Sequence, residues 1–149
     1  MKIVVQRSKN ASVVVDGNLV GSIDNGLTLL VGFTDGDTED TIDMMINKVI
    51  NLRIFDDENG VMNKSLLDVG GKILSISQFT LYADTRKGRR PSYIKALKAE
   101  YATKLYDLFN DKLRDLGIVV ETGIFGADMK VTLTNDGPVT ILMESELYG

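Results

Sequence analysis

Polar side chains that could carry chemistry follow directly on an apolar segment, at Ser77-Gln78-Phe79-Thr80. The segment Lys72–Phe79 alternates like a half-buried strand, so its polar end would lie where the chain leaves a sheet. Hydroxyl, carboxamide and backbone N–H groups gathered there could orient an ester and stabilise an oxyanion. Polar strand ends are also common in ordinary folds, so this stretch by itself leaves a site and a plain strand terminus open.

A second unusual stretch is Asn135–Thr140 (NDGPVT), in which a glycine and a proline separate two strand patterns. Proline has no N–H to donate to a sheet ladder. Gly137 and Pro138 would present two carbonyl oxygens with no glycine side chain in the way, which suits the capture of a cationic amine. A simple hairpin turn is the alternative.

The chain contains no histidine and no cysteine, which removes most familiar hydrolase mechanisms. Without imidazole, no side chain has an ordinary pKa near 7, and a Ser-His-Asp or Cys-His arrangement is impossible. The acidic stretch 35–40 (DGDTED) lacks the spaced glycine and closing glutamate of a calcium loop. We therefore expect no cofactor and no metal, and catalysis by hydroxyls, amides, backbone N–H groups and the substrate itself.

Positive charge is concentrated in one segment of a chain whose net charge is −4. The segment 84–98 (DTRKGRRPSYIKALK) carries six cations, Arg86, Lys87, Arg89, Arg90, Lys95 and Lys98. An isolated charge run is usually a solvated face, but this one follows the first polar motif closely, which favours contact with phosphates.

Several strands and two helices must position these motifs. Alternation predicts strands at Lys2–Arg7, Ala11–Val15, Leu19–Ile23, Gly26–Phe33, Lys72–Phe79, Ile118–Glu121, Met129–Thr134 and Val139–Met143. Hairpin turns are expected at Asp16-Gly17 and Asn25-Gly26, and a further turn at 57–60.

The first helix should start after Thr38 and bury one apolar face, formed by Ile42, Met45, Ile46, Val49 and Leu52. The second should open at Pro91 and Ser92 and end before a left-handed Gly117. Its apolar stripe would contain Leu97, Tyr101, Leu105, Leu108, Phe109, Leu113 and Leu116.

The 149 residues, 44% of them hydrophobic, fit one domain spanning 1–149. We predict an α+β fold in which β-sheets form a barrel-like or sandwich core covered by the two main helices. No apolar run approaches the roughly 18–20 residues of a membrane span, and the N-terminal residues alternate as a strand and not as a signal peptide. We therefore expect no membrane contact and a cytoplasmic location.

The two motifs together resemble the D-aminoacyl-tRNA deacylase family, formerly called D-tyrosyl-tRNA deacylases. SQFTLYAD at 77–84 and NDGPVT at 135–140 carry the resemblance. The order and spacing of five further segments agree with it: IVVQR near the N-terminus, NLRIF at 51–55, GG before KILSISQFTL, RRPS at 89–92 and GIFGADM at 123–129. The resemblance covers essentially the whole chain.

This resemblance implies a homodimer that hydrolyses D-aminoacyl-tRNA, and by extension mischarged glycyl-tRNA, as a proofreading step of translation. It implies that the Gly137-Pro138 peptide is cis and reaches into the partner's active site. There its carbonyl oxygens would hold the substrate's α-amino group, and an L side chain would strike the motif. Arg7 would brace this loop unless it is a surface arginine. Phe125 and Met129 would line the site near the terminal adenosine unless they are core residues.

Ester hydrolysis passes through an oxyanion, for which the backbone amides around Phe79 and Thr80 are the candidates, with Ser77 and Gln78 orienting the substrate. Thr80 acting as nucleophile is one alternative, although no histidine is present to activate it. The other is assistance by the 2′-hydroxyl of the terminal ribose. Arg86, Lys87, Arg89 and Arg90 would contact the acceptor end of the tRNA.

A non-catalytic RNA-binding dimer is the main alternative, although Ser77, Gln78, Thr80 and Gly137-Pro138 are intact. A scaffolding domain would need neither motif, and a nucleotide enzyme would need a phosphate-binding loop that is absent. The chain departs from the family pattern at Tyr82, where a small residue is common, and in its more basic loop RKGRR.

Overall fold

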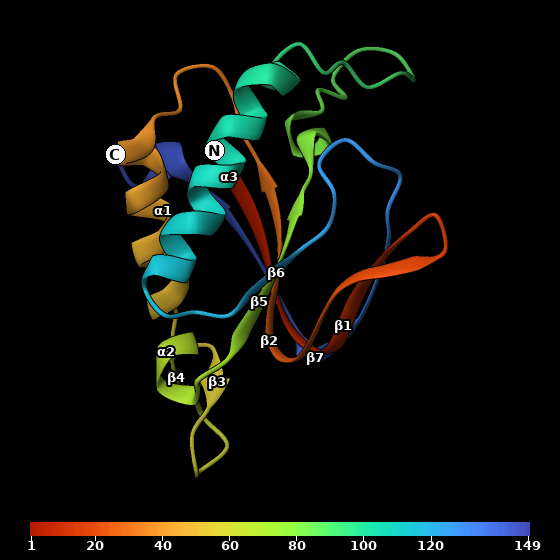
Figure 1. The fold of residues 1–149 in the computed structure, drawn as a ribbon. Helices are drawn as coiled ribbons and strands as arrows, with labels where there is room; N and C mark the ends of the chain where they lie inside the picture. Colours follow the sequence, from red (N-terminus) through yellow and green to blue (C-terminus); the bar gives the residue numbers. More distant parts are fainter.

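A five-stranded mixed sheet forms the centre of the computed structural model, which describes residues 1–149 (Figure 1). Its strand order is β6-β5-β2-β1-β7. The strands are β1 (Lys2–Val15), β2 (Asn18–Gly32), β5 (Lys72–Ser77), β6 (Val120–Thr122) and β7 (Lys130–Glu144). β1 pairs antiparallel with β2 and β7, whereas β5 pairs parallel with β2 and β6. The α+β class is therefore confirmed.

The N-terminal meander is simpler than predicted, because four expected strands merge into the two long strands β1 and β2. Asp16-Gly17 is the expected turn, and both residues have the positive φ that a two-residue hairpin favours. Asn25-Gly26 is not a turn and lies inside β2. A Cβ at Gly26 would collide with the backbone of Lys72, so this glycine permits the close approach of β5.

Two long helices cover one face of the sheet, α1 (Glu39–Asn51) and α3 (Ala99–Asp115), as Figure 1 shows. Thr38 is the N-cap of α1, and the predicted apolar face is buried through Val49. Lys112 of α3 forms 2.8 Å ion pairs with Glu39 and Asp43 of α1, which ties the two helices together.

The start of the second helix was predicted wrongly at Pro91 and Ser92, because α3 begins at Ala99. The residues before it bond to other segments: Ser92 pairs with Asp84, and the amide of Leu97 donates to the carbonyl of Phe33. Those backbone groups are therefore used outside a helix. Gly117 follows the last turn with a φ of 85°, as expected.

Only part of the predicted stripe of α3 is core. Phe109 and Leu113 are fully buried, whereas Tyr101 and Leu116 are about half exposed. Tyr106 and Asn110 lie on the buried face instead. The buried face of α3 therefore differs from the predicted apolar stripe and includes polar side chains.

The main core contains 22 buried residues between the helices and the sheet, and a group of five lies on the opposite face of the sheet. The expected barrel-like closure is not found, because the sheet is open and β6 and β7 are its edges. β6 has three residues and pairs only with β5, so the sheet ends there.

The smaller elements complete the chain: β3 (Phe55–Asp56), β4 (Met62–Lys64), α2 (Leu66–Val69), η1 (Phe79–Tyr82) and η2 (Ser145–Leu147). β3 and β4 form a separate two-stranded sheet around the predicted turn at 57–60. None of the helices has the length and apolar character that crossing a membrane requires.

Replacing Phe109 by alanine should destabilise the fold by about 3–5 kcal/mol, because a fully buried ring is exchanged for a cavity. Urea unfolding measures this. Tyr101→Ala on the same helix is the matched control, with an expected change of about 0.5 kcal/mol or less, since Tyr101 is 52% exposed. Equal losses in the two variants would contradict the packing described for α3.

Candidate active site

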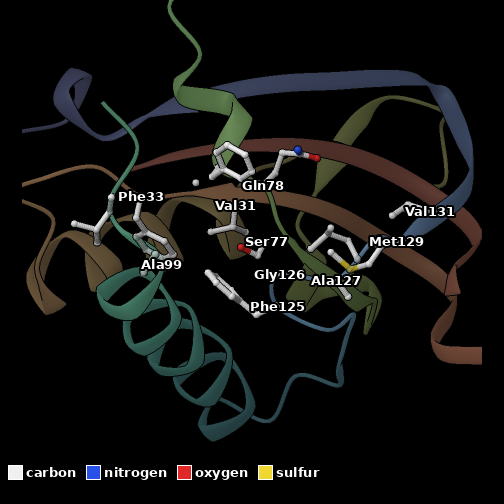
Figure 2. Close-up of a pocket in the computed structure, with 15 residues that line it drawn as sticks. Val31, Phe33, Ser77, Gln78, Ala99, Phe125, Gly126, Ala127, Met129 and Val131 are labelled. Atoms are coloured by element: carbon white, nitrogen blue, oxygen red, sulfur yellow. The ribbon is translucent and has the colours of Figure 1, made fainter. Parts of the chain in front are cut away.

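A cavity of about 480 Å³ opens where β5 leaves the sheet (Figure 2). It is mostly apolar and has a few polar groups on one wall, which is typical of a small-molecule site. Residues from four segments line it: Val31–Phe33 at the end of β2, Ile76–Phe79 at the end of β5, Leu97, Ala99 and Ala102 at the start of α3, and Phe125–Ala127 with Met129 and Val131 before and in β7.

The polar wall comes from the predicted strand end. β5 stops at Ser77, two residues earlier than expected, and the amide of Gln78 makes a last 2.8 Å bond to the carbonyl of Val31. The chain then turns into the short helix η1, so Ser77, Gln78 and Phe79 all line the cavity. Figure 2 shows the Ser77 side chain pointing into it toward Phe125.

Thr80 is not part of the cavity wall, although it follows Phe79 directly. Its hydroxyl oxygen accepts a 2.6 Å hydrogen bond from the carboxamide of Gln78. That carboxamide nitrogen is a donor and cannot take a proton from the threonine. Phe79 and Thr80 are the first residues of η1, so their backbone amides have no acceptor within that helix.

Phe125 and Met129 combine the two roles that the sequence left open. Both line the cavity, and each also packs against a buried cluster. The Phe125 ring lies 6.0 Å from that of Tyr106, whose hydroxyl donates to the Ser75 carbonyl. Burial raises the pKa of Tyr106, so this hydroxyl stays protonated behind the cavity.

The Gly137-Pro138 pair lies on a loop of four residues that bulges out of β7. Thr140 pairs with Gln6 and Asn135 with Ser8, so residues 136–139 all lie opposite the single residue Arg7. The Gly137-Pro138 peptide bond is cis, and both residues are exposed. Neither lines the cavity of its own chain. The strand continues on both sides, so the stretch is a bulge and not a hairpin turn.

Arg7 anchors this loop to the rest of the protein. Its Nε donates to the Asp136 carbonyl at 2.6 Å, and its Nη1 donates to the Ile54 carbonyl at 2.9 Å. The Asp56 carboxylate lies 3.2 Å from the same nitrogen. Arg7 is buried, so the alternative of a surface arginine does not hold. One bond of the guanidinium thus goes to the loop and two go to Ile54 and Asp56, so that Arg7 ties the loop to the chain around β3.

Asn135 also holds the loop at 136–139 in place, a role that was not predicted from the sequence. Its carboxamide accepts from the Val139 amide at 2.6 Å and donates to the Val139 carbonyl and the Thr140 hydroxyl at 3.2 and 2.8 Å. The side chain thereby closes the base of the loop in the way a backbone pair would. An asparagine close before a glycine, here two residues ahead of Gly137, is the sequence signal for such a local bond between side chain and backbone.

The basic loop 85–91 is closed at its base by two backbone bonds between Asp84 and Ser92, of 2.8 and 2.9 Å. The cations proposed from the sequence, Arg86, Lys87, Arg89 and Arg90, are all exposed on it. Arg86 is bound to the Asp84 carboxylate at 2.7 Å, which holds the pKa of that carboxyl well below its usual range. The loop thus carries its charge into solvent.

Comparisons with known proteins agree along the whole chain. Residues 4–144 match the family described as D-Tyr-tRNA(Tyr) deacylase. Proteins named D-aminoacyl-tRNA deacylase from Bacillus cytotoxicus and Bacillus cereus are each 60% identical over 98% of this chain and all of their own length.

Two solved structures share the fold. A structure titled c-Myc DNA Unwinding Element Binding Protein has a TM-score of 0.92 and 41% identity, and the match covers 97% of this chain and 98% of that one. A probable eukaryotic D-amino acid tRNA deacylase has a TM-score of 0.82 at 18% identity, over 95% and 97% of the two chains, which supports the fold alone.

Replacing Asn135 by alanine should loosen the loop at 136–139, since three hydrogen bonds at its base are lost. We expect faster hydrogen exchange at the Val139 amide and a loss of about 1 kcal/mol or more in unfolding free energy. Asn18→Ala, at the exposed β1–β2 turn, is the control and should leave Val139 unchanged. Unaltered exchange at Val139 in Asn135→Ala would show that Asn135 does not hold the loop.

Proposed function

The chain belongs to the D-Tyr-tRNA(Tyr) deacylase family, and from this we propose that it hydrolyses the ester bond of D-aminoacyl-tRNA, releasing the free amino acid and tRNA. The observation that carries the proposal is the placement of Ser77, Gln78 and Phe79 on the wall of the cavity. Removing D-amino acids from tRNA is a proofreading step of translation. Aminoacyl-tRNA is consumed by ribosomes, so we place the enzyme in the cytoplasm.

The ester carbonyl lies in this proposal at the polar wall, where hydrolysis must stabilise a tetrahedral oxyanion. The donors are the amide of Phe79, which lies on that wall, and the amide of Thr80, the next residue along η1, because the first amides of a helix have no acceptor within it. A fixed donor of this kind contributes about 2.7–4 kcal/mol to transition-state stabilisation in a well-studied hydrolase. Ser77 and Gln78 orient the substrate beside it.

Water is activated without imidazole, since the chain contains no histidine. Thr80 has no base beside it, because the side chain that contacts its hydroxyl is the Gln78 carboxamide, whose nitrogen donates and cannot take a proton. This favours assistance by the 2′-hydroxyl of the terminal ribose over attack by Thr80. In that step the hydroxyl polarises the ester or orients the attacking water, whose oxygen bonds to the carbonyl carbon. The oxyanion then collapses, the bond to the ribose 3′-oxygen breaks, and that oxygen takes up the proton that the water gives up. Thr80 then positions groups and forms no covalent intermediate.

Selection by handedness is assigned to the Gly137-Pro138 loop acting across a homodimer. The loop is exposed, held by Arg7 and Asn135, and outside its own chain's cavity, which suits a role in the cavity of a second copy. Its carbonyl oxygens hold the α-amino group there, and an L side chain would strike the loop. Glycine has no side chain to reject, so mischarged glycyl-tRNA is also a substrate.

Two features support the pairing of two copies. β7 is an edge strand of the open sheet, with no neighbour beyond it. The same strand carries Leu142, whose side chain is 53% exposed. An unpaired edge with exposed apolar groups is normally covered in the assembled protein.

The rest of the substrate is assigned to the remaining predicted residues. Phe125 and Met129 contact the terminal adenosine, because both offer apolar surface inside the cavity. Arg86, Lys87, Arg89 and Arg90 contact the acceptor end of the tRNA, because their charges lie exposed on one loop that follows η1. Phosphate contacts of this kind supply affinity without reading sequence.

Nucleic-acid binding without turnover is the second candidate function. One observation favours it: the solved structure with 41% identity is titled as a protein that binds a DNA unwinding element. The polar wall of the cavity argues for turnover, since a binding module needs no such groups.

The test incubates matched D- and L-tyrosyl-tRNA with the purified protein in the presence of EDTA. One assay then measures the activity, its selectivity for the D-ester and its independence of a metal ion. We expect only the D-ester to disappear, because the L side chain is excluded by the loop. The release of tyrosine over time is the readout. Binding of both tRNAs without cleavage would favour the binding module, and equal cleavage of both esters would contradict the role of Gly137-Pro138.

Thr80→Ala separates the two chemical alternatives. If Thr80 only positions groups, kcat/KM should fall by about tenfold or less, as for a lost hydrogen bond. A nucleophile would cost more than about 10⁴-fold. Thr103→Ala is the control, because that hydroxyl only donates to the Ala99 carbonyl within α3. Near-total loss of kcat with unchanged tRNA binding would overturn the 2′-hydroxyl mechanism.

A further inference from the structure

A second cavity, of about 290 Å³, lies at the other end of η1. It is small and polar, and its charge is mostly positive. Seven residues line it: Lys2, Tyr82, Ala83, Asp84, Thr85, Arg86 and Lys95. The three cations come from three separate places, the start of β1, the basic loop and the segment before α3, so only the tertiary structure brings them together.

The ammonium group of Lys2 and the backbone of Lys95 are held in place, and neither lysine forms an ion pair. The Lys2 ammonium lies 4.9 Å from the centre of the Tyr82 ring and 3.5 Å from the Leu81 carbonyl. The Lys95 carbonyl accepts a 2.5 Å bond from the Thr34 hydroxyl, which fixes the backbone there. Neither ammonium lies within 4 Å of a carboxylate. Glu144 lies opposite Lys2 in the strand register but forms no ion pair with it.

The only carboxylate on the cavity wall, Asp84, is already satisfied. It receives three bonds from the Arg86 side chain, of 2.7 to 3.1 Å, and one from the Arg86 backbone amide. These bonds use Nε and Nη2 of Arg86 and leave Nη1 without a protein partner. The residues that line the cavity therefore carry three positive charges and one negative charge.

The two cavities are joined by η1. Phe79, its first residue, lines the cavity of about 480 Å³, and Tyr82, its last, lines the second one. Three steps along a 3₁₀-helix span about 6 Å. The ester and the 5′-phosphate of the terminal nucleotide are attached to the same ribose, and a single nucleotide separates them by a distance of this order. Figure 1 shows the segment after η1 returning past it before α3 begins.

We propose that the second cavity binds the phosphate that joins the last two nucleotides of the aminoacyl-tRNA, with Lys2 and Lys95 as its main ligands and Arg86 as a third donor. The inference rests on the proposed function and adds a subsite to it. Lysine ammonium groups suit a phosphate as point charges, and the unused N–H groups of Arg86 add directed donors. The phosphate thereby fixes the ribose so that its ester lies at the polar wall.

The test compares 3′-O-D-tyrosyl-adenosine with the same ester carrying a 5′-phosphate, so that the two substrates differ only in the group in question. The proteins are the wild type, Lys2→Met, Lys95→Met and the double variant. Lys104→Met, an exposed lysine of α3 that lines neither cavity, is the control. Methionine keeps the length and apolar stem of lysine and removes only the charge.

The wild type should cleave the phosphorylated ester with a kcat/KM at least about tenfold higher than that of the unphosphorylated ester. The reason is that only the phosphorylated ester can form the charge-assisted bonds to the lysines. Each single variant should reduce this preference severalfold, and the double variant should abolish it while still cleaving the unphosphorylated ester. That retained cleavage shows that the variants are folded. With whole D-tyrosyl-tRNA, the salt dependence of kcat/KM should fall by about 0.7 in log–log slope per lysine removed.

Two results would overturn the assignment. Equal cleavage of the two esters by the wild type would show that no phosphate subsite exists, with the deacylase function intact. A preference that survives in the double variant would place the phosphate elsewhere, such as on Lys87, Arg89 and Arg90. If the wild type cleaved neither ester nor D-tyrosyl-tRNA, the proposed function itself would fail, and the subsite with it.

Discussion

The parallel pairing of β5 with β2 is the contact on which the rest of the structure depends. It buries β5 from Ile73 to Ile76, so the first polar side chains beyond it emerge only at the end of the strand. The pairing requires two glycines: a Cβ at Gly26 would meet the backbone of Lys72, and a Cβ at Gly32 would lie 2.9 Å from the Gln78 carbonyl. The position of η1, and with it both cavities, follows from this register.

A chain without histidine has to obtain its chemistry from groups that do not titrate near neutral pH. The proposed mechanism assigns this chemistry to backbone amides at the start of η1 and to carbonyls on the loop at 136–139. Arg7 and Asn135 hold that loop by bonds to backbone groups. Preorganisation of this kind stabilises charge without any reorganisation of the protein during the reaction.

The distribution of charge complements an anionic substrate even though the net charge of the chain is −4. Cations surround η1 and the loop after it, while Lys112 is bound to two carboxylates between the helices and has a raised pKa because of them. Local charge, and not the net charge, determines where a nucleic acid can approach, because charges in solution are screened within about 8–10 Å.

The sequence alone determined those properties that depend on local pattern: the α+β class, the cap and apolar face of α1, the turn at Asp16-Gly17, the absence of imidazole chemistry, and the two polar motifs. The tertiary structure decided the remaining features, in which contacts with distant segments override the local preference of the chain. Gly26 became the point where β5 approaches β2. The backbone groups of Ser92 and Leu97 bonded to Asp84 and Phe33, and the sheet stayed open. The fold also brought Lys2 and Lys95 to one cavity and allowed Asn135 to close the base of the loop at 136–139. Periodicity reports which face of an element is apolar, but it contains no information on which distant backbone will lie against it.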